Sequence, residues 1–119
     1  MHTILIVDDE ERIRNIYKRL FQAACSSAVR VLESTDAVTA TQCLIREDVD
    51  LVLLDIRMPN IDGRFMHEVI RECNPDIKVI VSSVMPVETQ KKMIPGASDY
   101  FDKSLGTIAL LEKVAESFV

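Results

Sequence analysis

The stretch LVLLD at residues 51–55 decides the fold of this chain of 119 residues. Its four apolar residues follow one another without alternation, which is typical of a strand that is covered on both faces. Similar short apolar runs recur along the chain and alternate with segments whose apolar residues repeat every three or four positions, as in one-faced helices. This alternation favours right-handed crossovers and a doubly wound parallel α/β sheet. We expect strands near 3–7, 28–33, 50–55, 77–82 and 98–102.

Five helices are predicted between and after these strands. Their apolar stripes, which include Ile16, Phe65 and Ile108, are interpreted as core. The fourth helix is the least regular, because Pro86 and Pro95 stand at its two ends and proline interrupts helices. The predicted helices lie near 13–24, 37–45, 65–73, 86–95 and 108–118.

Length and composition predict a single domain over residues 1–119. The net charge of −5 argues against a nucleic-acid surface. The apolar run at the N-terminus is too short for a signal peptide or a membrane span, so we expect a cytoplasmic protein without membrane contact. Cys25, Cys43 and Cys73 lack the close pairing of a zinc or disulfide site and are interpreted as small buried side chains.

Polar residues follow the apolar runs where the predicted strands end. If the strand order is 2-1-3-4-5, which is common for such chains, the order reverses between strands 1 and 3, and ligands bind there. Taken singly, the acidic pair reads as a helix cap, the serines as strand ends and the lysine as a surface residue. Together they predict a site for a divalent cation and a phosphoryl group. The residues are Asp8, Asp9, Asp55, Ser82, Ser83 and Lys103.

The charges of this set indicate its chemistry. Carboxylates that lie close together repel one another unless a cation joins them. Magnesium binds a few carboxylates, water and phosphate oxygens, and a carboxylate can itself be the nucleophile that forms an aspartyl phosphate. A serine hydroxyl that contacts the phosphoryl group only after its attachment would favour one conformation over another. The pattern therefore indicates a phosphorylation switch.

Two stretches carry a resemblance to a known family. ILIVDDE at 4–10 and LLDIRMPNIDG at 53–63 resemble the receiver domain of bacterial two-component response regulators of the single-domain, chemotaxis-regulator type. VIVSS at 79–83 and GASDYFDK at 96–103 are similar to its fourth and fifth strands. The resemblance covers the whole chain and implies a flavodoxin-like sheet of order 2-1-3-4-5 with five helices. It also implies phosphoryl transfer from a histidine kinase or a histidine phosphotransfer domain.

The resemblance implies a role for each residue of the site. Asp55 would be the phosphoacceptor and would hold Mg²⁺ or Mn²⁺ together with Asp9 and the backbone carbonyl of Arg57. Asp8 would act mostly through metal-bound water, and Lys103 would bind the phosphate. Met58 and Pro59 would shape the loop that follows the phosphoacceptor.

The resemblance also implies how the switch is read. Ser83 matches the switch hydroxyl, and Tyr100 matches an aromatic residue that changes rotamer with it. Output partners would bind the face formed by the fourth helix, the fifth strand and the fifth helix. The domain would catalyse only its own phosphorylation and dephosphorylation and would otherwise not be an enzyme.

Several positions depart from the family pattern. Ser104 replaces the usual proline after the lysine, Val84 replaces a small residue, and Pro95 stands where the fourth helix normally ends. The segment from Ser83 to Gly96 is also shorter than is usual in the family. These departures favour an alternative, a receiver-like interaction module without effective phosphorylation. A third hypothesis, a magnesium-dependent phosphohydrolase, ranks low, because haloacid dehalogenase-like enzymes carry an aspartate at the position of Arg57.

Overall fold

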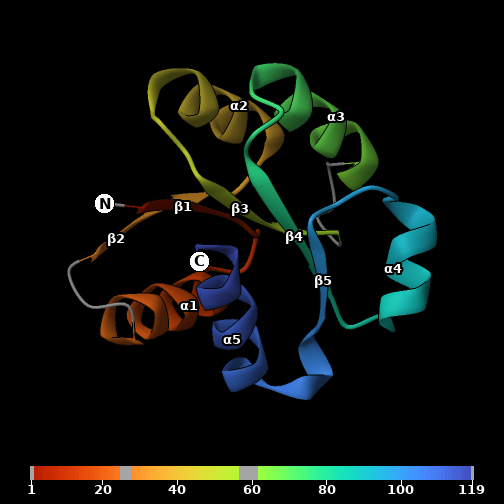
Figure 1. Cartoon of the computed structure of the whole chain (residues 1–119). Coiled ribbons are helices and arrows are strands. Elements are labelled where there is room, and N and C mark those ends of the chain that lie inside the picture. The colour runs from red at the N-terminus through yellow and green to blue at the C-terminus, as the bar shows by residue number, and fades with distance from the viewer. Residues whose placement is uncertain (1, 25–27, 57–61, 119) are drawn as a thin grey trace.

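The protein is described here from a computed structural model, which describes residues 2–24, 28–56 and 62–118. Five strands form one parallel sheet in the order β2-β1-β3-β4-β5, which confirms the predicted order (Figure 1). The strands are β1 (His2–Val7), β2 (Val29–Ser34), β3 (Leu51–Asp55), β4 (Lys78–Ser83) and β5 (Asp99–Asp102). The helices are α1 (Glu11–Ala24), α2 (Ala37–Arg46), α3 (Gly63–Cys73), α4 (Val87–Met93) and α5 (Thr107–Ser117), with a 3-10 turn, η2 (Lys103–Leu105), before α5.

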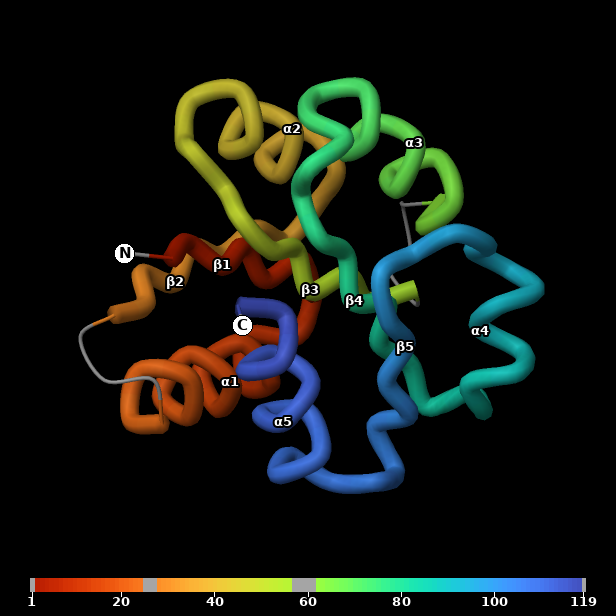
Figure 2. The backbone as a smooth tube through the Cα atoms, viewed as in Figure 1, coloured from red at the N-terminus to blue at the C-terminus, as the bar shows by residue number. Residues whose placement is uncertain are grey.

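Helices cover both faces of the sheet (Figures 1 and 2). The helices α1 and α5 lie on one face, whereas α2 and α3 lie on the other and α4 stands beside β5. Successive side chains of a strand point to opposite faces. Leu5 and Val7 therefore pack on the side of α2 and α3, while Ile4 and Ile6 pack on the side of α1 and α5. All five residues of β3 are buried, as its unbroken apolar run predicts.

Local residues explain where the helices begin and end. Asp36 accepts a hydrogen bond from the backbone N–H of Thr39 at 2.8 Å and so caps α2. The helix α4 has only seven residues, begins after Pro86 without a side-chain cap and ends before Pro95, as the two prolines predict. Gln90 is its one buried residue. The fourth helix is therefore held by few apolar contacts.

Two interpretations of the sequence are wrong in part. Ile16, Phe65 and Ile108 are 41, 59 and 73 % exposed, although each belongs to an apolar stripe. Each helix rests on the sheet along a narrow line, so residues at the edge of a wide stripe stay in solvent. Cys73 is exposed and Cys43 half-buried, which overturns the view that these cysteines are buried, and Cys25 lies outside the described residues. Within the ranges that the structure describes, no helix is long and apolar enough to cross a membrane.

Candidate functional site

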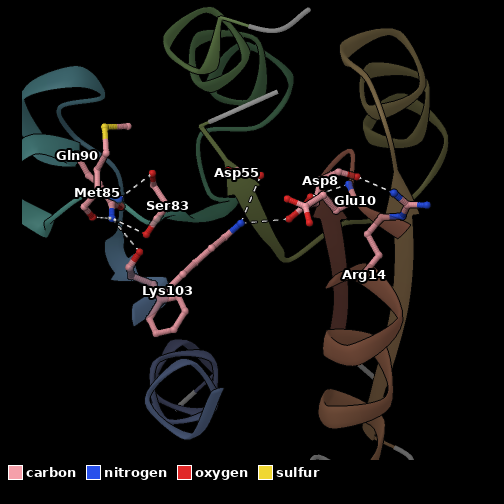
Figure 3. A network of polar contacts seen from close by, with 9 residues as sticks. Asp8, Glu10, Arg14, Asp55, Ser83, Met85, Gln90 and Lys103 are labelled. Atoms are coloured by element: carbon pink, nitrogen blue, oxygen red, sulfur yellow. Dashed lines mark hydrogen bonds and ion pairs between the residues drawn. The ribbon is translucent and has the colours of Figure 1, made fainter. Parts of the chain in front are cut away.

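Three of the predicted site residues meet at the carboxyl edge of the sheet. Asp8 follows β1 and Asp55 ends β3, and both are buried, with 2 and 4 % of their surface exposed. The Lys103 Nζ lies 3.5 Å from Asp8 Oδ2 and 3.4 Å from Asp55 Oδ2. Figure 3 shows the lysine side chain reaching across the sheet edge to both carboxylates. The strand order brings these three charges together, as the sequence predicts.

The acidic run that follows β1 adds further oxygen atoms. Asp9 is exposed, and carboxylate oxygens of Asp8, Asp9 and Glu10 lie within 4.8 Å of one another. The Glu10 backbone N–H donates to Asp8 Oδ1 at 2.9 Å. Glu10 was not among the predicted ligands, although its place directly after the aspartate pair was a visible signal. Arg57, for which a backbone ligand role is predicted, lies outside the described residues, as do Met58 and Pro59.

Burial and like charge set the electrostatics of the site. Burial raises the pKa of Asp8 against the opposing hydrogen bond from Glu10, and the charge of Asp55 raises it further. Burial alone would lower the pKa of Lys103, but the charges of Asp55 and Asp8 raise it overall. The two buried carboxylates thus share one ammonium. Hard oxygen donors with excess negative charge fit a divalent cation such as magnesium.

The two predicted switch residues lie apart from the charges. Ser83 is fully buried, and its hydroxyl oxygen accepts a hydrogen bond from the Met85 backbone N–H at 3.1 Å. Tyr100 is buried in the core cluster that also contains Met66 and Ile70 of α3 and Ile94 after α4. Its hydroxyl donates to the Ile94 carbonyl at 2.5 Å and accepts from the Ala97 N–H at 3.2 Å. The aromatic ring therefore already points inward.

Gln90 joins the two strands beside the site and was missed by the sequence analysis. Its Nε2 donates to the carbonyls of Met85 and Phe101 at 2.8 Å and of Ser83 at 3.4 Å (Figure 3). A lone glutamine between two prolines was the only available signal. The Gln90 amide fixes the segment that follows Ser83.

The residues that depart from the family pattern have defined surroundings. Among the described residues no peptide bond is cis, so the bond between Lys103 and Ser104 is trans. The Ser104 N–H donates to Asp102 Oδ1 at 2.9 Å, which starts the 3-10 turn η2. The Val84 side chain is 56 % exposed and is not packed into the interior.

Gly63, the first residue of α3, lies close to the end of α4. A Cβ atom at this position would stand 2.9 Å from Ile94 Cδ1 and 3.6 Å from the Cα of Ile56, the residue that follows Asp55. The missing side chain leaves room for Ile94, which is 1 % exposed. Three segments therefore meet beside the end of β3.

Comparison with known proteins places this geometry in a family. The model of the response regulator receiver domain matches residues 4–115. The chain belongs to the response regulator receiver domain family. This receiver domain is 30 % identical over 113 residues to the transcriptional regulatory protein DegU of Brevibacillus brevis, which covers 93 % of this chain and 48 % of that protein. Like other receiver domains, it is a phosphoryl-accepting signalling switch of two-component systems.

Solved structures agree with this receiver domain over almost its whole length. The response regulator TrrA of Thermotoga maritima, in complex with Mg²⁺ and beryllofluoride, matches with a TM-score of 0.82 and 28 % identity, covering 98 % of this chain and 99 % of that one. TrrA in complex with the histidine kinase ThkA matches with a TM-score of 0.81 and 29 % identity, covering all of both chains. This receiver domain spans about a quarter to a half of the length of the first curated relatives it matches.

Proposed function

We propose that residues 1–119 form one receiver domain that accepts a phosphoryl group on Asp55 in a two-component phosphorelay. One observation carries this assignment. The Lys103 ammonium stands between Asp55 and Asp8, at 3.4 and 3.5 Å, while both carboxylates are buried. A buried carboxylate can act as a nucleophile and form an aspartyl phosphate. The cation beside it can then neutralise a negative charge of the attached phosphoryl group.

The proposed transfer follows from the positions of these groups. A carboxylate oxygen of Asp55 attacks the phosphorus of a phosphohistidine, the new P–O bond forms, and the P–N bond breaks with its electron pair going to the imidazole. The Lys103 ammonium then exchanges its ion pair with the carboxylate for an ion pair with a phosphoryl oxygen. Ser83 would donate to another oxygen once its segment has moved toward Asp55.

The proposed cofactor is Mg²⁺ or Mn²⁺. Asp9, Asp55 and the backbone carbonyl of Arg57 would hold the ion, with Asp8 acting mostly through water. The ion would neutralise the carboxylates and the phosphoryl oxygens. The oxygen donors of the acidic run and the raised pKa of Asp8 support this assignment, as does the Mg²⁺ in the TrrA complex.

The proposed donor partner is a histidine kinase or a histidine phosphotransfer domain, which the complex of TrrA with ThkA supports. We expect the output partner to bind the face of α4, β5 and α5. The domain would act as a switch that catalyses only its own phosphorylation and dephosphorylation. Its cytoplasmic location stays a prediction.

A specific observation favours a second candidate, a receiver-like interaction module without effective phosphorylation. The Ser83 hydroxyl oxygen accepts from the Met85 N–H, which ties its position to the segment after β4, and Val84 beside it is larger than the usual residue. A domain whose switch hydroxyl stays in this arrangement would bind partners in one state only.

Intact mass spectrometry after incubation with acetyl phosphate and Mg²⁺ tests the proposal. We expect one phosphoryl adduct in the parent and none in Asp55→Asn, because an amide is a far poorer nucleophile. Asp36→Asn is the matched control, since asparagine also caps a helix and the change lies at α2. A full adduct in Asp55→Asn would contradict the assignment, whereas no adduct in the parent would favour the interaction module.

A further inference from the structure

Four polar residues extend one row of the sheet toward α1 and α5. Ile6, Leu53, Ile80 and Phe101 belong to the core cluster on this face. Within β3 and β4 the residues two positions further along, Asp55 and Ser82, point to the same side. Asp8 and Lys103 directly follow β1 and β5, and the Lys103 ammonium reaches both Asp8 and Asp55. Asp55 is also the direct register partner of Ser82. Ser82, and not Ser83, is therefore the serine that shares a row with the charges.

The Ser82 hydroxyl occupies a buried place without a defined hydrogen bond. The residue is 1 % exposed, and its Oγ has no hydrogen-bond partner among the residues that the structure describes. A buried hydroxyl that stays unpaired destabilises the fold, so each such group in a native protein calls for an explanation. Its position beside Asp55 suggests that the explanation belongs to the site.

Tyr17 provides a second hydroxyl on the same face. It lies on α1, is 5 % exposed and packs in the cluster that contains Leu53 and Ile80. Burial raises the pKa of the Tyr17 phenol; the Lys103 ammonium lowers it, and the charges of Asp8 and Asp55 raise it again. The neighbouring Ser82 side chain lowers this pKa slightly, although Ser82 Oγ does not reach a full hydrogen bond. Because Tyr17 packs with Leu53 and Ile80, it lies on the sheet face to which Asp55 and Ser82 point.

We propose that Tyr17 and Ser82 are positioning residues. Their two hydroxyls, called the hydroxyl pair, hold the Lys103 ammonium from the side of the sheet that α1 covers. An ammonium has three donor hydrogens, and the distances of 3.4 and 3.5 Å to the two carboxylates leave it loosely held. In the proposed arrangement the phenol oxygen would accept from the remaining side of the ammonium, and the Ser82 hydroxyl would donate to that oxygen. The hydroxyl pair would keep Lys103 directed at Asp55 when the phosphoryl group arrives. Its role in phosphorylation rests on the proposed function of Asp55.

A purely structural role is the competing explanation, because Tyr17 also packs on Phe21, with ring centroids 6.1 Å apart. Tyr17→Phe keeps the ring and removes only the hydroxyl. Ser82→Ala is the second variant, and Phe21→Leu is the matched control, since it perturbs the same helix and core without touching a hydroxyl. Two readouts separate the explanations: the side-chain ¹⁵Nζ resonance of Lys103 without any phosphodonor, and the rate of adduct formation with acetyl phosphate and Mg²⁺.

We expect Tyr17→Phe to move the Lys103 resonance and to slow adduct formation roughly 5- to 10-fold, the effect of losing one hydrogen bond. Ser82→Ala should do the same to a smaller extent. The double variant should be little slower than Tyr17→Phe alone, because the two hydroxyls act as a unit. Phe21→Leu should lower the melting temperature and leave both readouts near the parent values.

The two readouts also separate this proposal from the proposed function. If the parent forms no adduct, the phosphoacceptor assignment fails, and the Lys103 resonance alone decides on the hydroxyl pair. An unchanged Lys103 resonance in Tyr17→Phe overturns the hydroxyl pair. An unchanged adduct rate in Tyr17→Phe, or an equal loss in Phe21→Leu, overturns it as well when the parent is phosphorylated.

Discussion

Gln90 on α4 donates from Nε2 to the backbone carbonyl of Phe101 on β5 at 2.8 Å. The same nitrogen reaches the carbonyls of Met85 and Ser83, so a single amide joins α4, β5 and the segment between β4 and α4. Because α4 buries no other residue, a polar contact holds the fourth helix where an apolar stripe would normally do so.

Removing this amide should destabilise the domain. Gln90→Ala leaves buried carbonyls without a donor, and we expect the free energy of unfolding to fall by about 2–4 kcal/mol. Urea denaturation measures the change. The control is Gln42→Ala on α2, an exposed glutamine in a helix, which should alter stability by less than about 0.5 kcal/mol. Equal effects of the two substitutions would show that the Gln90 contacts contribute nothing.

The proposed metal site predicts a stabilising effect of Mg²⁺. An ion that binds only the native state adds about 2.7 kcal/mol at a concentration of 100 Kd, and the parent should melt at a higher temperature in its presence. Asp9→Ala should lose most of this increase. Glu11→Ala, an exposed acid two residues further along, is the control and should keep it. The increase within each variant is the quantity to compare, since removal of a like charge can itself shift the baseline. Similar increases in all three proteins would place the ion elsewhere.

His67 on α3 predicts an acid-sensitive contribution to stability. The side chain is 6 % exposed, and its pKa is lowered by burial and by the nearby Arg71 charge. The unfolded chain therefore binds a proton at a higher pH than the folded one, so this contribution is complete above the unfolded pKa of about 6.5 and is lost as the pH falls through the folded pKa.

Urea midpoints measured between about pH 7.5 and 5.5 test this sign. His67→Gln should flatten the decline in stability toward acid pH, whereas His2→Gln, a substitution at an exposed position, should decline like the parent. If the stability of the parent and that of His67→Gln change by the same amount between about pH 7.5 and 5.5, His67 is not responsible for the decline.

The switch predicts a change at a distance from Asp55. Beryllofluoride mimics a phosphoryl group, and we expect it to shift backbone amide resonances across residues 86–103, because Ser83, which accepts a hydrogen bond from Met85, would have to move toward the mimic to donate to it. In Ser83→Ala the shifts should be confined to the surroundings of Asp9 and Asp55. Parent shifts that never reach 86–103 would mean that the site binds phosphate without changing the face of α4 and β5.

Much of the site follows from the sequence because it depends on strand order. Apolar runs that end in Asp8, Asp55 and Lys103 place these residues at one edge of any sheet of order 2-1-3-4-5. The depth of each side chain does not follow in the same way. Neighbouring aspartates read alike, yet Asp8 is buried and Asp9 exposed, because β1 ends at Val7 and the chain already bends at Asp9.

Side chains that cross between elements were beyond the sequence patterns. Gln90 sits in a helix too short to show a periodicity, and its acceptors are backbone carbonyls, which every residue possesses. Tyr17 lies in an apolar stripe, where an aromatic residue reads as core. The exposure of Ile16 and Ile108 depends on the width of each helix contact, which periodicity does not report.

Because Gly63 has no side chain, two other residues share the space beside it. Ile56, which follows Asp55, and Ile94, which follows α4, both border the space that a Cβ atom would fill. A displacement of either residue changes the space that is left beside Gly63 for the other, since close-packed interiors hold few voids. The chain thus contains a steric link from the acceptor strand to the fourth helix that involves no charge and no hydrogen bond. Each methylene added at position 63 would bias that link permanently, which makes this position a place to set the resting state of the switch by size alone.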